Sequence, residues 1–510
     1  MATYKIGTRG SLLAVTQSTL MKNELERISG ESFELVLIKT QGDEVTNVPL
    51  WQLEGKDFFT KELDEALLKG DVDLVIHSYK DLGSVRPEGI KLAAVTERKF
   101  AHDILLISQE TVDKLPTWGG EFIVGTSSPR RIENLTKSLP TFLPHIKNIR
   151  CETLRGNVNT RIKKLRENQY HAITLALAGL ERLAQTHKSA EELKALLKKM
   201  NYLVLPQSTF PSAASQGALG IETREDREDG GKLLKIISQL SHERTVEEVI
   251  RERKAFKEFG GGCHLAVGIH VKKIGEHFLH VHAGTVDGNR IEKKWLEGAT
   301  LPSLSAKKKL FVGLPKGEKS GIVYDEFLEK TPEKRSLELD KKHVFVTSRY
   351  CLPSLQSSTQ GRPASLWAAG SKTASILSDA GFWINGTSDS LGTQDLHDLK
   401  ASMALRMMNA DLKGDWLTLS HDDGKNDLGA VIGCYKRKAR AIDPKFEEAL
   451  REVGACFWTS FPQYEIFMKS FPFLKEVHHF CGLGKTWQEF QKAGIKVNVT
   501  PSMEEFYALA

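Results

Sequence analysis

The chain has 510 residues, of which 40% are hydrophobic and 27% are charged, and this composition excludes a largely disordered or fibrous protein. The net charge is +6, but lysines and arginines alternate with acids, so no concentrated basic stripe indicates a nucleic-acid partner. Six scattered cysteines without a Cys-x-x-Cys pair exclude a disulfide scaffold and a thiolate zinc site, and we expect no metal.

The N-terminal residues have no apolar segment behind their charges, which is not the pattern of a signal peptide. No apolar run approaches the length of a membrane span. We therefore expect a cytoplasmic protein with reduced thiols and no membrane partner.

Strand and helix patterns alternate from the N-terminus to about residue 240, which predicts α/β layers with mainly parallel strands. Strands are predicted at 4–8, 33–39, 73–78, 122–125 and 172–177. Helices are predicted after Ser11 as far as Gly30, at 58–68, after Ser128-Pro129, and from Thr160 to Leu165.

The pattern changes at about residue 241. A helix at 246–259, a glycine-rich loop and alternating strands at 264–271 and 277–285 predict a small α+β unit. Residues 306–342, with three consecutive lysines, glycines and a charged run, are interpreted as a linker. The α/β rhythm resumes at His343, with strands predicted at 344–346, 416–419, 456–459 and 477–480. Two similar stretches, 369–373 and 482–486, indicate an internal repeat of two α/β halves.

Four loops that follow strands, or precede helices, carry cations close to hydroxyl groups. They are Thr8–Ser11, Gly55–Lys61, Gly125–Arg131 and Leu154–Arg161. Helix N-termini attract anions, and arginine forks match carboxylates, so the four loops together predict a site for a small anionic ligand. The alternative for any one loop is a helix cap beside solvated surface charge.

Asp81 lies at the end of an apolar strand within His77–Leu82 and is placed to project into a cleft. A carboxylate among cations suits stabilisation of a developing cation, or proton transfer near one. The alternative is a carboxylate that pairs with Lys80 or caps the next turn.

Three glycines, 260–262, precede Cys263 and allow positive φ angles and the close approach of a bulky group. The alternative is a small core residue on a glycine turn. A cysteine–histidine dyad with His264 has little support, because neighbouring residues of a strand point to opposite faces.

Together these motifs resemble the hydroxymethylbilane synthase family, also called porphobilinogen deaminase, over residues 1 to about 305. The motifs occur in the family's order: Thr8–Ser11, Thr40–Asp43, Gly55–Glu62, His77–Asp81, Gly125–Arg131, Leu154–Arg161, Ala178–Leu183, Gln216–Glu222, and Glu252-Arg253 followed by Gly261–Cys263. The family's Arg-x-Asp-Pro-Arg-Asp run is altered here to Arg98–Asp103.

The resemblance implies two similar α/β domains around a cleft, at 1–96 with about 215–238 and at 97–214, and a small α+β domain at 239–305. It implies a dipyrromethane cofactor bound as a thioether to Cys263, and the head-to-tail condensation of four porphobilinogen molecules with release of ammonia. Asp81 and Lys80 match catalytic positions. Cofactor-binding residues would be Cys263, Ser128, Arg130, Arg131, Lys80 and Asp81. Substrate-binding residues would be Arg9, Ser11, Lys56, Phe59, Thr126, Ser127, Arg155, Arg161, Arg182, Gln216 and Arg253. The substrate is the small-molecule partner, and we expect a monomer.

Residues 343–510 resemble uroporphyrinogen-III synthase, which folds as two α/β domains and closes hydroxymethylbilane into a ring. The resemblance rests on the two Gly-x-Lys-Thr elements, paired Thr-Ser residues, Cys434–Arg437 and Thr500–Ser502. It implies a catalytic Tyr435 and substrate-side hydroxyls at Ser460 and Thr486. A phosphate-binding P-loop at 482–486 is excluded by its spacing.

Two alternatives stay open. Two α/β lobes around a cleft also suit a solute-binding protein of anionic ligands, which would carry no covalent cofactor. The C-terminal half could instead be a non-catalytic domain.

Overall fold

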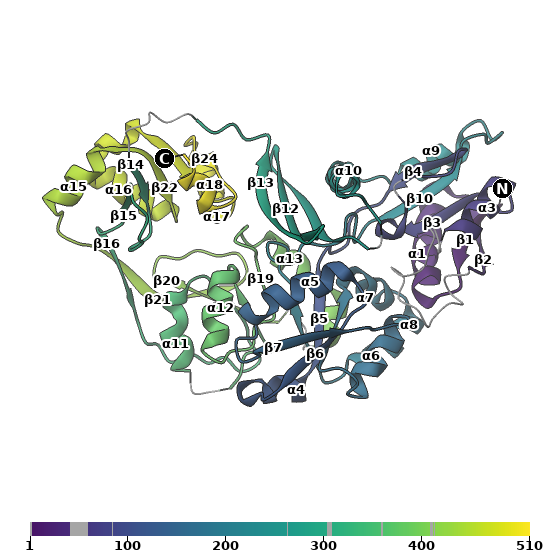
Figure 1. Cartoon of the computed structure of the whole chain (residues 1–510), viewed down its shortest axis with the longest axis horizontal. Helices are drawn as coiled ribbons and strands as arrows, with labels where there is room; N and C mark the ends of the chain where they lie inside the picture. Colours follow the sequence, from purple (N-terminus) through teal and green to yellow (C-terminus); the bar gives the residue numbers. More distant parts are fainter. Residues whose placement is uncertain are drawn as a thin grey trace. The chain divides into compact units, whose positions relative to one another are not determined.

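The computed structural model describes residues 3–40, 60–83, 85–262, 264–302, 309–358, 361–408, 412 and 414–509 (Figure 1). The chain forms two compact units, the first made of Met1–Lys273, Val281–Glu292 and Ser402–Asp411, and the second of Ile274–His280, Lys293–Ala401 and Leu412–Ala510. The predicted α/β fold class is confirmed by the sheets and helices of both units. Among the described residues, no helix is both long enough and apolar enough to cross a membrane.

The first sheet of the first unit has the strand order β2-β1-β3-β10-β4. Its strands are β1 (Thr3–Arg9), β2 (Ser32–Ile38), β3 (Leu74–Ser78), β4 (Ile90–Val95) and β10 (Leu219–Arg224). Strand β1 is parallel to β2 and β3, whereas β10 is antiparallel to β3 and β4. Because β10 comes long after β4 in the chain, the chain leaves this sheet, builds a second one and returns.

The second sheet repeats this arrangement with the order β7-β6-β8-β5-β9. Its strands are β5 (Asp103–Ser108), β6 (Glu121–Gly125), β7 (Asn148–Glu152), β8 (Ala172–Ala176) and β9 (Met200–Val204). Here β6 is parallel to β7 and β8, and β5 is antiparallel to β8 and β9. The two sheets therefore share one pattern, in which three parallel strands are followed by a fourth strand that is antiparallel to the third and to the fifth.

The four helices predicted in this region are present among the helices around these sheets. The helices around the two sheets are α1 (Leu12–Ser29), α3 (Lys61–Lys69), η2 (Tyr79–Asp81), α4 (Gln109–Lys114), η3 (Leu115–Thr117), α5 (Pro129–Ser138), η4 (Leu139–Thr141), α6 (Val158–Arg166), α7 (Leu177–Ala184), α8 (His187–Leu197) and α9 (Lys232–Ser238). Ser11 caps α1, since its hydroxyl accepts the amide N–H of Ala14 at 3.3 Å. The helix ends where Gly30 takes a φ of 69°. The hydroxyl of Ser128, in contrast, makes no capping hydrogen bond to α5.

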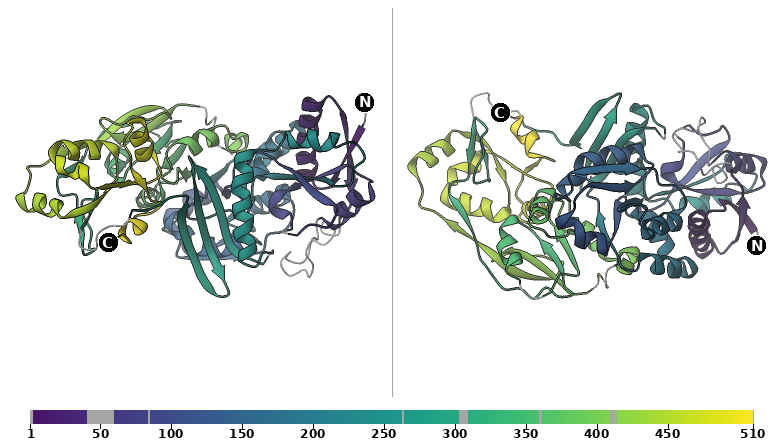
Figure 2. Two further views of the ribbon diagram at one scale, coloured as in Figure 1. Left: turned by 90° about the horizontal axis from the view of Figure 1, so that it is seen from above. Right: turned by 60° about the horizontal axis from the view of Figure 1, so that its bottom comes forward.

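Helix α10 (Glu243–Glu258) leads into a sheet of order β11-β12-β13 and lies beside it in Figure 2. The strands are β11 (Ala266–Ile274), β12 (His277–Val286) and β13 (Asn289–Glu297). Ala255 of the helix packs with Val267 and Ile269 of β11, and this apolar contact fixes the position of the glycine loop between them.

Helix α14 (Met403–Met408) belongs to the first unit although it comes late in the chain. The carboxylate of Glu181, on α7, accepts the Ser402 hydroxyl at 2.8 Å and the amide N–H groups of Met403 and Ala404 at 3.2 Å. Glu181 thus caps the N-terminus of α14 from the neighbouring helix α7. It directly precedes the predicted site residue Arg182 in the sequence.

The second unit contains two sheets. One has the order β15-β14-β22-β23-β24, and its strands are β14 (Lys309–Val312), β15 (Ile322–Tyr324), β22 (Val453–Trp458), β23 (His478–Cys481) and β24 (Asn498–Val499). The other has the order β16-β21-β20-β17-β18-β19, and its strands are β16 (Leu328–Pro332), β17 (His343–Val346), β18 (Ser365–Ala368), β19 (Gly386–Thr387), β20 (Trp416–His421) and β21 (Ala430–Ala439).

The helices of this unit follow the strands. They are η5 (Arg349–Cys351), α11 (Leu352–Gln356), α12 (Ser371–Asp379), α13 (Gln394–Lys400), α15 (Pro444–Arg451), α16 (Phe461–Ser470), η6 (Pro472–Glu476), α17 (Lys485–Lys492) and α18 (Met503–Tyr507). Helices α12 and α17 start at the two similar stretches and follow β18 and β23 respectively, as the predicted internal repeat requires.

The segment 306–342, predicted to be a linker, instead belongs to the sheets of the second unit. Strand β14 pairs in parallel with β22, and β16 pairs antiparallel with β21, so this segment contributes to both sheets of the second unit. Leu310 and Val312 are fully buried in the core with Phe480 and Phe506. Burial of this apolar surface holds the segment in the sheet despite its charged neighbours.

Candidate functional site

A cavity of about 1170 Å³ opens in the first unit, lined by loops from both of its large sheets. The loops after β1, β3, β7 and β8 contribute, together with residues 216–218 before β10. Ligands of α/β proteins bind at the carboxyl ends of strands, where these loops begin.

The structure brings nine of the predicted site residues together in the lining of this cavity. They are Arg9, Ser11, Lys80, Asp81, Arg131, Arg155, Arg161, Arg182 and Gln216. The lining also contains Lys39 and Lys164, so eight cationic side chains face one acid, Asp81, among the described residues of the cavity. The cavity is therefore strongly electropositive.

Burial destabilises the charged form of several of these side chains and so lowers their pKa values. It lowers the pKa of Lys80, and it lowers the pKa values of Arg161 and Arg182 to about 10. The like charges of Arg131 and Arg155 act in the same direction on Arg161, whereas the charge of Asp81 opposes the shift of all three. An anionic ligand would relieve this electrostatic cost.

Backbone carbonyls hold two of the arginines in place. Arg161 donates from Nε to the carbonyl of Gly156 at 2.7 Å, and Arg182 donates from Nη2 to the carbonyl of Gly217 at 2.6 Å. Gly217 has a φ of 93°, and a Cβ there would lie 2.6 Å from the carbonyl oxygen of Lys99, so only glycine fits.

Asp103 is a site residue that the sequence analysis missed. It is 1% exposed, and its carboxylate accepts Arg130 Nη2 at 2.8 Å, Arg131 Nη2 at 2.6 Å and Gln216 Nε2 at 2.9 Å. These two guanidinium groups hold its pKa far below the usual range, overcoming the effect of burial. Gln216 also accepts Lys80 Nζ at 3.3 Å, so a hydrogen-bonded chain connects Lys80 to Arg131.

We expect Asp103→Asn to lower the free energy of unfolding by about 3–5 kcal/mol, because two buried guanidinium groups lose their counter-charge. Urea denaturation measures this loss. Asp71→Asn, at an exposed aspartate, is the matched control and should change stability by less than about 0.5 kcal/mol. Equal stability of both variants would mean that Asp103 does not hold the arginines.

Other predicted residues lie around the cavity but not in its lining. Arg130 is buried and also donates to the carbonyl of Pro211 at 2.8 Å. Ser127 donates to the carbonyl of Leu154 at 2.9 Å and accepts its amide at 3.1 Å, which fixes the loop that carries Arg155. The Thr126 hydroxyl accepts the amide N–H of Ser128 at 3.3 Å.

Arg253, predicted to bind substrate, contacts the turn that carries Lys80 and Asp81. Its guanidinium lies 4.6 Å from the ring centre of Tyr79 and donates from Nη2 to the carbonyls of Leu82 at 3.0 Å and Gly83 at 2.7 Å. In the structure it holds this turn from α10.

Three predicted site residues, Lys56, Phe59 and Cys263, lie outside the described residues. The loop before Cys263 is described, and Gly260, Gly261 and Gly262 have φ angles of 94°, 62° and 94°. The prediction that these glycines adopt positive φ is confirmed.

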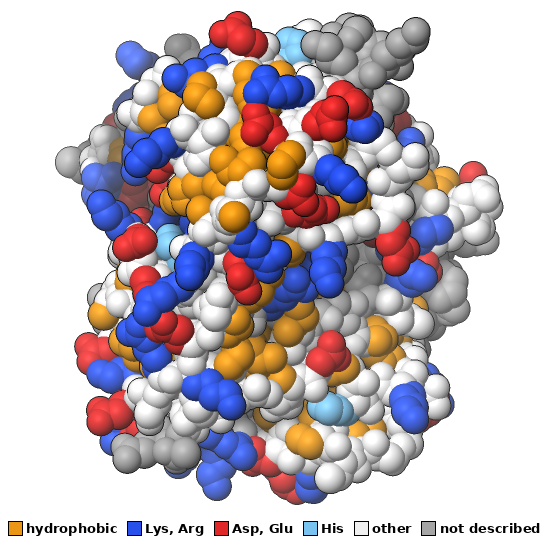
Figure 3. Space-filling model, turned by 90° about the vertical axis from the view of Figure 1, so that its left-hand side faces the viewer, with side chains coloured by type: hydrophobic (Ala, Val, Ile, Leu, Met, Phe, Trp, Pro, Cys, Tyr) orange, Lys and Arg blue, Asp and Glu red, His pale blue; other side chains and the backbone are white. Residues whose placement is uncertain are grey.

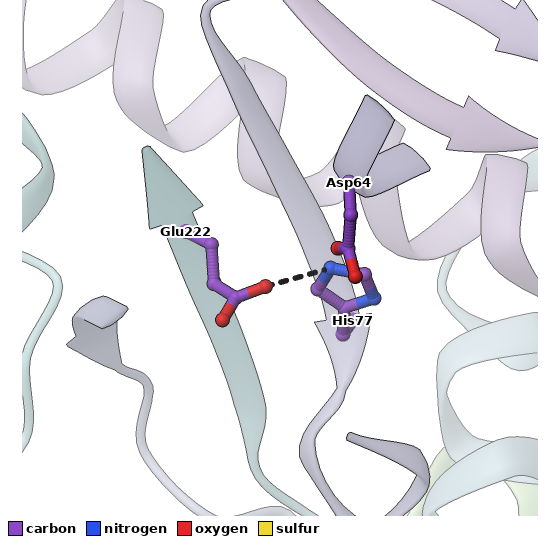
Figure 4. A group of neighbouring side chains, drawn as sticks. All are labelled: Asp64, His77 and Glu222. Carbon is purple, nitrogen blue, oxygen red and sulfur yellow. Dashed lines mark ion pairs between the residues drawn. The ribbon is translucent and has the colours of Figure 1, made fainter. Parts of the chain in front are cut away.

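A buried cluster lies beside the cavity strand β3. Asp64, His77 and Glu222 place possible ligand atoms within 4.8 Å of one another, and Figure 4 shows the three side chains converging, with His77 Nε2 3.2 Å from Glu222. Arg86, however, donates to Asp64 at 2.5 Å and to Glu222 at 2.7 and 2.8 Å. This guanidinium compensates both carboxylates, so the cluster has the character of a structural ion-pair network.

The predicted residues of the C-terminal region lie in the second unit. Thr486 donates to the carbonyl of Thr459 at 3.4 Å, and Ser460 precedes α16, so both hydroxyls lie at one end of the β22–β23 pair. Tyr435 lies on β21 of the other sheet, 4% exposed, with its ring centre 5.9 Å from that of His421. Lys485, next to Thr486, is among the charges that lower the pKa of His421, after burial and Arg437. Arg437 and Lys485 therefore both contribute charge near His421, whose ring neighbours that of Tyr435.

Comparison with known proteins gives one family match. The family model described as "Porphobilinogen deaminase, dipyromethane cofactor binding domain" matches residues 4–231. Porphobilinogen deaminase of Nitratiruptor sp. is 37% identical over 298 residues, covering 58% of this chain and 87% of the relative. That of Geobacter sulfurreducens is 38% identical over 296 residues, covering 58% and 85%. That of Lachnospira eligens is 36% identical over 317 residues, covering 61% and 99%.

Among solved structures, a uroporphyrinogen-III synthetase from Helicobacter pylori is 17% identical, with a TM-score of 0.28, covering 39% of this chain and 95% of that chain. A similarity at this level carries no argument about the second unit.

Proposed function

The chain belongs to the porphobilinogen deaminase family, and we propose that it condenses four porphobilinogen molecules head to tail into hydroxymethylbilane, releasing ammonia at each step. Porphobilinogen would be its small-molecule substrate, and tetrapyrrole biosynthesis its role.

One observation carries this proposal: the described lining of the cavity has eight cations and a single acid. Each pyrrole unit of the growing chain brings an acetate and a propionate, so a chain of several rings brings many carboxylates into one cavity. Buried carboxylates are costly without partners, and arginine forks bind them in bidentate fashion. The excess of arginines suits such a polyanion.

The residues present also fit the dipyrromethane cofactor of the matched domain. Arg131, Arg155 and Lys80 line the cavity and are placed to bind its carboxylates, and we assign the thioether to Cys263. When bound, the cofactor supplies the pyrrole carbon to which the first substrate is added.

Asp81 is proposed as the catalytic residue. It is exposed to the cavity at the end of β3, and its charge acts on Lys80, Arg161 and Arg182. A carboxylate in this position would bind pyrrole N–H groups and stabilise the cation that forms when porphobilinogen loses ammonia.

The test is incubation of the purified chain with porphobilinogen, with measurement of ammonia release and of intact mass after denaturation. We expect catalytic consumption of porphobilinogen and a covalent mass increment of two pyrrole units. Stoichiometric binding without ammonia release would favour the alternative, a solute-binding protein.

For the C-terminal half we propose cyclisation of hydroxymethylbilane to uroporphyrinogen III, with Tyr435 assisting loss of the hydroxyl group. The placement of Tyr435 beside His421, on which the charges of Arg437 and Lys485 act, favours this second function. Ser460 and Thr486 would be hydroxyls of the same site.

The full-length chain supplied only with porphobilinogen is then expected to yield the type III isomer, because hydroxymethylbilane closes to type I without an enzyme. Tyr435→Phe should shift the product towards type I, and porphobilinogen consumption should stay unchanged. Chromatography of the oxidised porphyrins separates the isomers. Type I alone from the intact wild-type chain would mean that the C-terminal half does not cyclise.

A further inference from the structure

Two cations lie directly opposite each other on paired strands of the second unit. Lys330 of β16 is the register partner of Arg437 of β21 in an antiparallel pair, so both side chains lie on one face of the sheet. Tyr435, two residues before Arg437, shares that face. Like charges directly opposite each other destabilise a sheet unless an anion compensates them.

A third cation, Arg349, completes this group. Both Arg349 and Lys330 lie against the ring of Tyr350, at 5.2 and 5.6 Å from its centre, and that ring is 5.5 Å from the ring of Tyr435. We call Lys330, Arg349 and Arg437 the cationic cluster. Figure 3 shows that lysine and arginine side chains, with acids among them, are common on one face of the molecule.

The described acids near the cluster already have other partners. Glu489, on which the charge of Arg437 acts, lies 3.9 Å from Lys485 and is also reached by the charge of Lys492. The acid whose charge acts on Lys330 is Asp325, but its carboxylate already accepts the amide N–H groups of Phe327 and Leu328 at 3.0 and 2.9 Å and the side-chain amide of Gln463. Burial, together with Arg437 and Arg349, lowers the pKa of Lys330 to about 8.

Arg437 also has unused hydrogen-bonding capacity. Its Nε and Nη1 atoms are buried without a hydrogen-bond partner among the described residues. Buried guanidinium donors are nearly always satisfied, so a group absent from the protein chain is the natural acceptor.

The neighbouring lysine shows the contrast. Lys436 lies one residue away on β21 and therefore on the opposite face, where it pairs with Glu333 at 2.5 Å and Asp422 at 3.7 Å. Two acids thus form ion pairs with Lys436, whereas no ion pair is found for Lys330, Arg349 or Arg437 among the described residues.

We propose that Lys330, Arg349 and Arg437 form a carboxylate-binding site beside Tyr435. A carboxylate can accept a hydrogen bond from one of the unpaired donors of Arg437 and an ammonium hydrogen bond from Lys330 at once. That the carboxylate belongs to a pyrrole acetate or propionate of a linear tetrapyrrole rests on the proposed cyclisation. In that case the cluster would orient the substrate against Tyr435.

The test is site-resolved protection of Lys330 from acylation in the full-length chain, read by peptide mass spectrometry. The probe is uroporphyrin I, which carries the same acetate and propionate groups and is stable. We expect saturating uroporphyrin to slow the acylation of Lys330 at least about tenfold and to leave that of Lys436 unchanged. Equal acylation of Lys330 with and without uroporphyrin would overturn the proposal.

Arg437→Gln should raise the uroporphyrin concentration needed for half-protection of Lys330 about tenfold, the effect of losing about 1.4 kcal/mol of binding free energy. Lys436→Gln, the matched control, should leave it unchanged. Unchanged protection in a folded Arg437→Gln variant would remove Arg437 from the site. Isomer analysis tests the proposed cyclisation separately from this site. If the chain formed the type III isomer but uroporphyrin did not protect Lys330, the cyclisation would stand and the carboxylate site would be refuted.

Discussion

Cys263→Ala is expected to abolish the condensation of porphobilinogen while the protein still folds. The thioether anchor that we assign to Cys263 has no substitute in an alanine side chain. Loss of a single sulfur atom on a glycine loop removes little packing. The variant should therefore lack the covalent mass increment of two pyrrole units in denaturing mass spectrometry, and it should release no ammonia from porphobilinogen.

Cys151→Ala is the matched control in the same unit. Burial raises the pKa of the Cys151 thiol to about 11, so this sulfur is mostly protonated at neutral pH and a poor nucleophile. The control variant should keep both the mass increment and the activity. A Cys263→Ala chain that retained the increment would place the cofactor on another side chain.

The parallel strands and their helices could be predicted because their patterns are local. The sequence predicts a helix that is capped by Ser11 and ends at Gly30, and the structure confirms both. The order of the strands could not be predicted from the same patterns. Strand β10 joins the first sheet by pairing with β3, far away in sequence, and only tertiary contacts decide such a pairing.

The error at 306–342 has a similar cause. Strand β14 has only four residues and follows a run of lysines, so its local pattern resembles a loop. It becomes a strand because β22 on one side and β15 on the other satisfy its backbone hydrogen bonds. Strand β22 lies far away in the sequence, and the local pattern of residues 309–312 does not indicate this pairing.

The cations of the cavity and Asp81 could be identified from the sequence because they stand in recognisable motifs. Asp103, which binds Arg130 and Arg131, could not be identified in this way. Asp103 opens an apolar strand, and a charged residue at the start of Asp103–Ser108 is a signal that it has a buried partner. Its partners are Arg130 and Arg131, and this pairing depends on the tertiary packing of α5 against β5, which cannot be predicted from local sequence patterns.

Asp81→Asn is expected to slow elongation by about 10²–10³, the typical effect of removing one preorganised electrostatic group from a reacting centre. Asparagine keeps nearly the same shape and one acceptor oxygen, so pyrrole N–H groups could still be bound. It cannot supply the negative charge that offsets the cation formed as ammonia leaves. The effect is large because Asp81 is the single acid in the described lining of a cavity with eight cations.

The measurement is rapid-quench mass spectrometry of purified Asp81→Asn, which resolves the addition of each porphobilinogen unit to the protein. We expect the covalent cofactor to be present in the variant. The mass before substrate is added shows whether it is, and so separates slow elongation from failed attachment of the cofactor. Asp71→Asn, which removes an exposed carboxylate, is the control and should elongate at the wild-type rate. If Asp81→Asn added each unit within a few-fold of the wild-type rate, the charge that stabilises the cation would have to come from another group, and among the described lining residues no second carboxylate is available.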